Sequence, residues 1–421
     1  MTGVTPAPAR RLIGFGLGIA AYLIGLFHRA APATIAADLA QSFETSAAAL
    51  GVLAATYYWV YTAMQIPSGI LADTLGPRRL LAGGGLIAAA GAALFALAPG
   101  FGVAATGRLL VALGGSVAFV ACLKLIASWY DARIFATLTG VVVLVGNLSS
   151  AAAGGPFAWL LQSFGWREVI LALAAASLVV AIASWVLVDD LLRARSVGLE
   201  AGWRKGLGGV LANPATWPIF LANFGAGGSF LSFATLWAVP YLVDVHGMAR
   251  PAAANHVTVV LGVFAVGGLV IGTLSDRMRR RKPLYAGGAG LLFLAWTPLV
   301  AGWPLGGAEN YVLFGVMGVA TGGMTLSWAC CKEVNAPQYA GIATGVANMA
   351  IFLGPAVMQP VIGWVLDVSQ SDGVRAAATH DPDEWHRALI VLAALALFGF
   401  TAALFVRETR ARNVFRPPAA R

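Results

Sequence analysis

The chain has 421 residues, of which 59% are hydrophobic and 11% are charged, and its mean hydropathy is +0.79. Because about 25% of the residues of a soluble domain are charged, this composition excludes a soluble enzyme and requires lipid to cover much of the surface. The formal charge of +9 does not indicate nucleic-acid binding, since the basic residues lie in short gaps between apolar segments, where they orient a membrane protein.

Twelve apolar segments are long enough to cross a bilayer core of about 30 Å. Their backbone polar groups must be satisfied without water, which leaves helices or closed barrels. The segments are rich in Ala, Leu, Val and Gly and do not alternate, so an all-α membrane protein is predicted rather than a barrel. In chain order, the predicted transmembrane helices cover residues 12–37, 47–72, 78–99, 102–127, 134–162, 167–188, 215–243, 253–275, 283–303, 309–333, 339–367 and 385–406.

The gaps between the spans set the expected orientation. Arg10 and Arg11 precede the first span, and no cleavage site follows a short apolar region, so we predict an uncleaved helix rather than a signal peptide. With a cytoplasmic N-terminus, most gap arginines and lysines face the cytoplasm, which favours an even number of spans and two cytoplasmic termini. The three cysteines, Cys122, Cys330 and Cys331, lie inside apolar segments and indicate neither a disulfide framework nor a metal site.

Two stretches of the first half of the sequence recur in the second half. Residues 69–79 and 272–282 share the pattern Gly-x-Leu-x-Asp followed by a basic pair, at an offset of 203. Residues 114–124 and 322–332 share a Gly-Gly pair followed by Ala-Cys-x-Lys, at an offset of 208. Two matches in the same order indicate a duplicated six-span unit. We therefore predict two pseudo-symmetric six-helix bundles, over residues 1–188 and 215–421, joined by a central cytoplasmic loop over residues 189–214.

The segment GILADTLGPRR, at residues 69–79, resembles the signature loop of the major facilitator superfamily, and residues 272–282 repeat it. Two positions depart from the pattern: Thr74 stands where the family often has a basic residue, and Arg279 stands at the loop glycine of the second copy. The resemblance implies a monomeric secondary transporter that works by alternating access, uses no cofactor and is driven by a proton or other ion gradient.

The repeated loop also predicts a gate. A carboxylate at a helix end beside arginines forms charge-assisted hydrogen bonds, and such bonds latch one side of a transporter in one conformation and release it in the other. The alternative is that these residues cap helices and set topology. The residues to which we assign gating are Gly69, Asp73, Arg78, Arg79, Asp276 and Arg281.

A narrower resemblance, to the anion:cation symporter branch, covers the first two spans. It rests on Phe27-His28-Arg29 with Pro32, and on Gln65-Ile-Pro-Ser-Gly69 in the second span. The branch implies that the substrate is an organic anion such as a sugar acid, and that Arg29 binds it, because a planar guanidinium suits a carboxylate. The alternative is that Arg29 snorkels to the membrane interface. His28 stands where the branch has an aspartate, and it is predicted either to carry the coupling proton or to be a packed, hydrogen-bonded histidine.

Further candidates for the substrate site lie on four other spans. Lys124 and Lys332 are equivalent in the repeat, and in a central cavity they would attract anions; alternatively, both snorkel to lipid headgroups. Each aromatic taken singly is expected to pack within the bundle, but as a group they suit a ligand with an anionic end and hydroxyls or a ring. The polar and aromatic candidates are Tyr57, Tyr61 and Gln65 on one helical face, and Trp237 and Tyr241 on the seventh span.

The expected function is transport of a small organic anion across a bacterial inner membrane, with proton coupling. The alternative is a proton-coupled exporter of drugs, a class with a glycine-rich fifth-span motif; here Gly155 and Pro156 fit that motif, but Ala151 and Trp159 stand where glycine is expected. A third possibility, a non-transporting sensor or scaffold, has no appended soluble domain to support it. The expected partners are the anionic substrate and membrane lipids.

Overall fold

The computed structural model describes residues 8–130, 135–189, 202–304, 306–369 and 380–415, and every regular element within these ranges is helical. The first eight helices are α1 Pro8–Phe43, α2 Ala47–Ala63, α3 Gln65–Ala96, α4 Phe101–Gly115, α5 Ala118–Trp129, α6 Phe135–Ala152, α7 Gly155–Leu160 and α8 Trp166–Leu187. The remaining ones are α9 Gly202–Ala212, α10 Trp217–Ser232, a π-helix Phe233–Trp237, α11 Ala238–His246, α12 Arg250–Met278, α13 Lys282–Val300, α14 Gly307–Gly322, α15 Leu326–Val334, α16 Ala340–Ser369 and α17 Pro382–Leu404. Short 3₁₀-helices lie at Pro214–Thr216, Gly323–Thr325 and Pro337–Tyr339.

The helices agree with the predicted membrane plan. Eleven helical stretches within the described ranges are long and apolar enough to cross a membrane. The remaining predicted span, residues 47–72, corresponds to α2, which has 17 residues, and to the first part of α3 beyond a break at Met64. The chain is therefore a multi-pass helical membrane protein, as its composition predicts.

Two of the described helices, α1 and α3, contain a residue with non-helical backbone angles. In α3 the bend lies at Gly76, with φ 78° and ψ 162°, directly before Pro77. In α1 Ile35 leaves the helical region, with φ −109° and ψ 18°, three residues after Pro32. Proline removes a backbone donor and disturbs the turn before it, which explains the bend at Gly76. The irregular residue of α1 lies six positions after Arg29.

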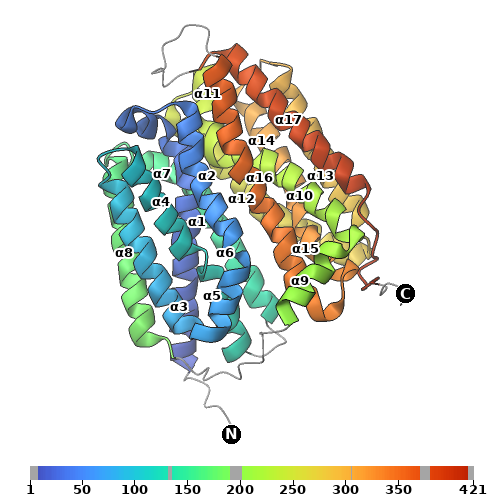
Figure 1. Cartoon of the computed structure of the whole chain (residues 1–421). Helices are drawn as coiled ribbons and strands as arrows, with labels where there is room; N and C mark the ends of the chain where they lie inside the picture. The colour runs from blue at the N-terminus through green and yellow to red at the C-terminus, as the bar shows by residue number, and fades with distance from the viewer. Residues whose placement is uncertain (1–7, 131–134, 190–201, 305, 370–379, 416–421) are drawn as a thin grey trace.

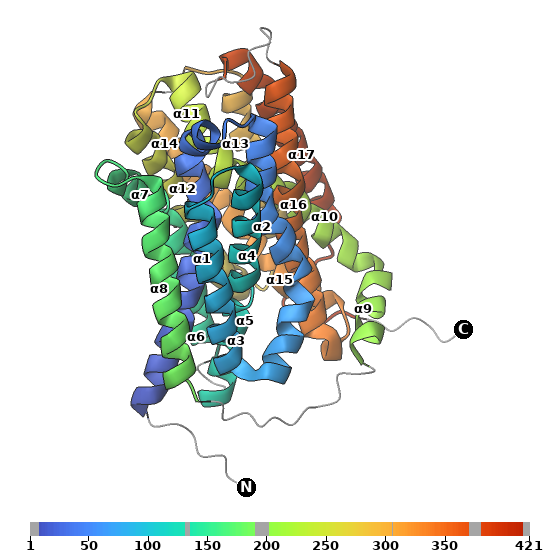
Figure 2. The same cartoon turned by 60° about the vertical axis from the view of Figure 1, so that its left-hand side comes forward.

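Figures 1 and 2 show the helices in two groups, α1–α8 and α10–α17, which we call the first and second halves. The terminal side is where α1 begins and α17 ends, and the distal side is where α1 ends and α12 begins. The halves meet through α2 against α16, α6 and α7 against α12, and α1 against the π-helix and α11. Among the described residues, the hydrogen bonds and ion pairs that join the halves lie at the distal side and in the middle of the bundle.

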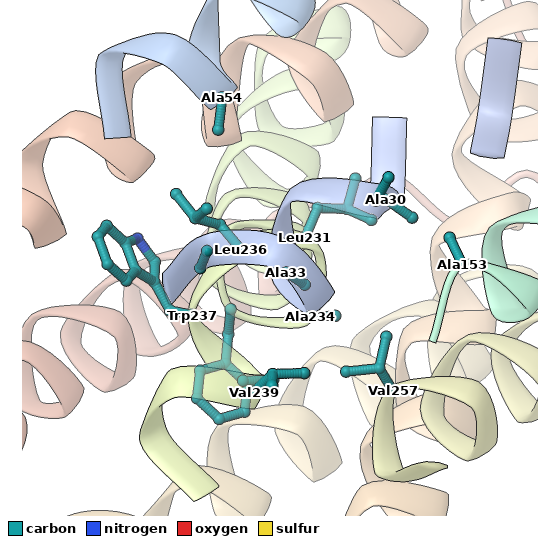
Figure 3. Packing of buried hydrophobic residues seen from close by; sticks show 14 of the residues in the cluster. Ala30, Ala33, Ala54, Ala153, Leu231, Ala234, Leu236, Trp237, Val239 and Val257 are labelled. Carbon is teal, nitrogen blue, oxygen red and sulfur yellow. The ribbon is translucent and has the colours of Figure 1, made fainter. Parts of the chain in front are cut away.

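Small residues let the two halves approach closely. Figure 3 shows Ala30 and Ala33 of α1 beside Leu231 and Ala234 of the second half, with Ala153 nearby. All five are buried. Between membrane helices, association depends on close van der Waals packing rather than on the hydrophobic effect, and small side chains permit it. The centre of this interface holds the polar residues described next.

Candidate functional site

Arg29 lies in α1 at the interface between the halves, and its side chain is 7% exposed. Its Nη2 donates a hydrogen bond to Ser150 Oγ of α6 at 3.3 Å, while its Nε has no partner among the described residues. No acidic side chain of those residues forms an ion pair with Arg29. A buried arginine in a membrane bundle normally has a partner for its charge, so Arg29 offers an unmatched positive site.

Aromatic rings from both halves cover this guanidinium. Phe352 of α16 lies with its ring centroid 5.8 Å from Arg29 Cζ. Tyr61 of α2 packs against Phe352, with centroids 4.4 Å apart, and is stacked on Tyr57 at 5.9 Å. A ring face attracts a cation weakly compared with a carboxylate. The rings therefore complete an apolar wall without neutralising the charge.

Tyr57 is fully buried within the first half rather than free to meet a ligand. Its hydroxyl donates to the carbonyl of Gly25 at 2.9 Å, and its ring lies 5.6 Å from Cζ of Arg108. Arg108 Nη1 in turn donates to the carbonyl of His28 at 2.7 Å. These contacts tie α2 and α4 to α1, so Tyr57 supports the wall behind Tyr61.

His28 is buried, and neither ring nitrogen has a hydrogen-bond partner among the described residues. It borders a small apolar cavity between α1, α3, α4 and α8, together with Gly25, Val111 and Ser177. A proton added to this ring would place a second positive charge beside Arg108 in an apolar surrounding, which is unfavourable. This placement differs from the hydrogen-bonded histidine expected as the alternative.

Two polar contacts join helices of the two halves. Asn348 of α16 donates through Nδ2 to Gln65 Oε1 of α3 at 3.1 Å. Tyr58 of α2 and Thr235 of the π-helix share a hydrogen bond of 2.7 Å, and Gln359 Nε2 donates to the same Thr235 hydroxyl at 3.1 Å. Any rocking of one half against the other must break or remake these contacts.

The two lysines lie toward the terminal side. Lys124 is half-buried in α5, and Lys332 is exposed two residues before the end of α15. Asn413 of the C-terminal segment donates to the carbonyl of Lys332 at 3.2 Å. An exposed ammonium near a helix end fits the snorkelling alternative as well as the attraction of anions.

Trp237 and Tyr241 lie toward the distal side, away from Arg29. Tyr241 is hydrogen-bonded to His246 Nε2 at 3.2 Å, and Trp237 packs against Trp385 with centroids 6.2 Å apart. Trp237 also lines a cavity of about 240 Å³ between the halves, together with Arg250. The two residues therefore belong to a distal chamber and to the packing around it.

In the second copy of the repeated loop, Arg281 forms ion pairs with two carboxylates. Its Nη1 bonds to Asp276 Oδ1 at 2.6 Å and its Nη2 to Glu333 Oε1 at 3.1 Å. Burial alone would lower the pKa of Arg281, but Glu333 and Asp276 raise it above its ordinary value. Glu333 is also hydrogen-bonded by the Thr409 hydroxyl, so the C-terminal segment joins this network.

The first copy is arranged differently. Arg78 lies over the ring of Trp185, with Cζ 4.7 Å from the centroid, and Arg79 is exposed. Gly69 lies in the first part of α3. The side chain of Asp73 lies outside the described residues, so its predicted role in gating stays a prediction.

Several residues that contact Arg29, Tyr58 or Arg281 were not predicted from the sequence. Ser150 and Thr235 were not assigned to the site with Arg29, and Phe352 and Glu333 come from spans whose neighbours the sequence does not reveal. A polar residue inside an apolar span was the available signal for Ser150 and Thr235. In the described ranges, no group of three or more His, Cys, Asp or Glu side chains is arranged to hold a metal ion.

Comparisons with known proteins agree with this arrangement. The sequence model of the Major Facilitator Superfamily matches residues 15–359. A protein named probable sulfoacetate transporter from Cupriavidus necator is 24% identical over 82% of this chain and 85% of its own length. A protein named probable galactarate/D-glucarate transporter from Bacillus subtilis is 22% identical over 87% of this chain and 89% of its own length.

Solved structures show the same fold. A bacterial homologue of the human lysosomal transporter Spinster, solved inward-facing and unoccupied, superposes with a TM-score of 0.72 at 18% identity, covering 95% of this chain and 98% of that one. A nucleoside transporter superposes with a TM-score of 0.75 at 14% identity, covering 94% of this chain and 99% of that one.

Proposed function

Because this chain belongs to the Major Facilitator Superfamily and is therefore a membrane transporter, we propose that its substrate is a small organic anion of the carboxylate or sugar-acid class. The observation that carries this proposal is Arg29, which is buried between the halves and has, among the residues that the structure describes, one hydroxyl partner and no carboxylate. A guanidinium in this setting is costly unless a negative group visits it. Its planar fork binds a carboxylate through two parallel hydrogen bonds.

Two relatives support a negatively charged substrate. The names of the proteins from Cupriavidus necator and Bacillus subtilis specify sulfoacetate and galactarate or D-glucarate, all of which are organic anions. The hydroxyl of Ser150 lies beside Arg29, and the amides of Gln65 and Asn348 meet between the halves, four residues from Tyr61 and Phe352; all three are neutral hydrogen-bonding groups. Such groups suit the hydroxyls or second acid group of a polar anion.

The transport cycle follows from the contacts between the halves. We assign the terminal side to the cytoplasm of a bacterial inner membrane, in accord with the distribution of arginine and lysine. The described conformation is then closed on the outside, where Arg250 of α12 pairs with Asp38 of α1. On the cytoplasmic side, we assign the gate to Asp73 and Arg78 in the first half and to the network around Arg281 in the second.

Coupling to a proton gradient is part of the proposal, but His28 is a poor carrier in the described state. Its ring faces an apolar cavity, and Arg108 is bonded to its carbonyl. Transport that acidifies the receiving compartment in step with anion uptake is the expected signature.

Thermal stabilisation of the purified protein tests the substrate class. D-Glucarate and sulfoacetate are compared with neutral galactitol and with the lipophilic cation tetraphenylphosphonium. Ligand at about 100 times its Kd is expected to stabilise the folded state by about 2.7 kcal/mol. Stabilisation by the cation alone would reject the anion proposal and favour a drug exporter.

Variants test whether stabilisation by the anion depends on Arg29. Arg29→Gln should weaken anion binding at least about tenfold, because it removes hydrogen bonds from a charged group. Arg387→Ala is the matched control, since this arginine is exposed on α17. Full anion affinity in Arg29→Gln would show that the anion binds elsewhere.

A further inference from the structure

Asp367, near the end of α16, binds the first turn of α2 in the other half. Its Oδ1 accepts a hydrogen bond from the backbone N–H of Ala47 at 3.0 Å, and its Oδ2 accepts one from the N–H of Ala48 at 2.8 Å. Both contacts lie on the distal side, where α2 begins and α16 ends. A side chain of the second half therefore caps a helix of the first half.

The start of α2 needs such a cap. The first N–H groups of a helix have no partner within the helix, and they carry the positive end of its dipole. Ser46 satisfies one of them, since its hydroxyl accepts from Ala49 N at 3.3 Å. The carboxylate of Asp367 satisfies two more through charge-assisted hydrogen bonds, which are stronger than neutral ones.

Glycines bring the two helices close enough for this contact. A Cβ at Gly363 would lie 2.2 Å from the carbonyl oxygen of Ala47, and a Cβ at Gly51 would lie 2.4 Å from that of Gln359. Side chains at either position would therefore force α2 and α16 apart. The cap of Asp367 forms only while the backbones of the two halves stay in this close contact.

We propose that Asp367 is a positioning residue for the transport cycle, which stabilises the distally closed state by capping α2 from the opposite half. Alternating access requires the halves to separate on this side. Separation leaves the N–H groups of Ala47 and Ala48 to water and removes the carboxylate from the helix dipole. The proposal rests on the transporter family and on this contact, and it is independent of the substrate's charge.

Two variants remove the contact from opposite sides. Asp367→Asn removes the charge, and Ala47→Pro removes one of the two N–H donors. Proline is well tolerated at the first position of a helix, and Ser46 before it has φ −75° and ψ 167°, an extended conformation that suits a residue preceding proline. The control is Asp383→Asn, which removes an exposed carboxylate from the first turn of α17.

Distances from double electron–electron resonance measure how far the halves separate on the distal side. Spin labels attached after Gln41→Cys and Ala308→Cys stand at exposed distal positions of opposite halves, while the native cysteines are buried. Asp367→Asn and Ala47→Pro should each raise the ratio of the long-distance to the short-distance population at least about tenfold. The effect of their combination should be smaller than the sum of the two effects, because both changes act on the Ala47 hydrogen bond and only that of Ala48 remains in Ala47→Pro.

The control variant should keep the wild-type distance distribution. The proposal is overturned if either Asp367→Asn or Ala47→Pro leaves that distribution unchanged, or if the two effects simply add. Ala47→Pro alone decides the matter if Asp367→Asn does not fold. Anion binding by Arg29 is measured separately by thermal stabilisation, so failure of one proposal does not imply failure of the other.

Discussion

Gly76 and Arg279 occupy equivalent turns of the repeated loop, and both have positive φ, at 78° and 51°. Their ψ angles differ: Gly76 has ψ 162°, whereas Arg279 has ψ 38° and lies in the left-handed helical region. The first combination is open almost only to glycine, while the second admits other residues at a modest cost. The second copy can therefore carry Arg279 where the family has a glycine, because its backbone conformation admits other residues.

Gly76→Ala is expected to destabilise the protein by about 1–3 kcal/mol, because the new Cβ occupies a conformation that L-residues avoid. Thermal unfolding in detergent measures the loss. Arg279→Gly is the matched change at the equivalent turn and should stabilise slightly, since it removes a left-handed non-glycine residue. Equal melting temperatures for Gly76→Ala and wild type would show that the bend tolerates a side chain.

Thr235→Val should weaken the contact between the halves. The hydroxyl of Thr235 is the partner of both Tyr58 and Gln359, and all three side chains are buried. Valine keeps the shape but leaves two polar groups unsatisfied, each at a cost of about 1–3 kcal/mol. The measurement is thermal unfolding.

Tyr58→Phe is the milder comparison, because Thr235 keeps its hydrogen bond to the Leu231 carbonyl. The expected order of stability is wild type, then Tyr58→Phe, then Thr235→Val. A Thr235→Val protein as stable as wild type would contradict it.

Glu333→Gln should loosen the terminal side of the second half. Arg281 and Glu333 are both largely buried, with side chains 9% and 13% exposed, so loss of one charge leaves Arg281 with Asp276 alone. The expected loss of stability is about 1–3 kcal/mol. Arg280→Ala, at an exposed neighbouring position, should change stability by less than about 0.5 kcal/mol. Similar losses in both variants would show that the network contributes nothing specific.

The C-terminal segment should detach in acid through Glu408. Burial alone would raise the pKa of Glu408, but the N–H groups of Arg281, Arg410 and Lys282 donate to its carboxylate and bring the pKa below its ordinary value of 4.5. A depressed pKa gives a stabilisation that is complete above the ordinary value and is lost as the pH falls through the folded-state pKa. Attachment should therefore persist at neutral pH and be lost only as the pH falls below the ordinary value of 4.5, through the lowered pKa of the folded state.

A fluorophore attached after Asn413→Cys reports this release, since Asn413 contacts Lys332 and Asn335. Glu408→Gln removes the titrating group and should release the segment at all pH values. An acid transition that persists unchanged in Glu408→Gln would assign the effect to another carboxylate.

The amino-acid sequence alone was sufficient for the membrane plan and the repeated loop, and it made Arg29 a candidate for the site. Each depends on local information: a span is a run of apolar residues matched to the bilayer thickness, and a duplicated unit repeats its own pattern. A charged residue within such a run stands out without any neighbour. Division of the chain into bundles over residues 1–188 and 215–421 is a prediction of the same kind.

The tertiary structure alone decided which groups meet. Tyr57 and Tyr61 share a helical face, yet Tyr57 is bonded to Gly25 within the first half and Tyr61 packs against Phe352 of the second. Asp367 reaches Ala47 across 320 positions of the sequence. Such partners depend on how whole helices pack, and close packing between membrane helices is a property of matched surfaces, which no short segment encodes.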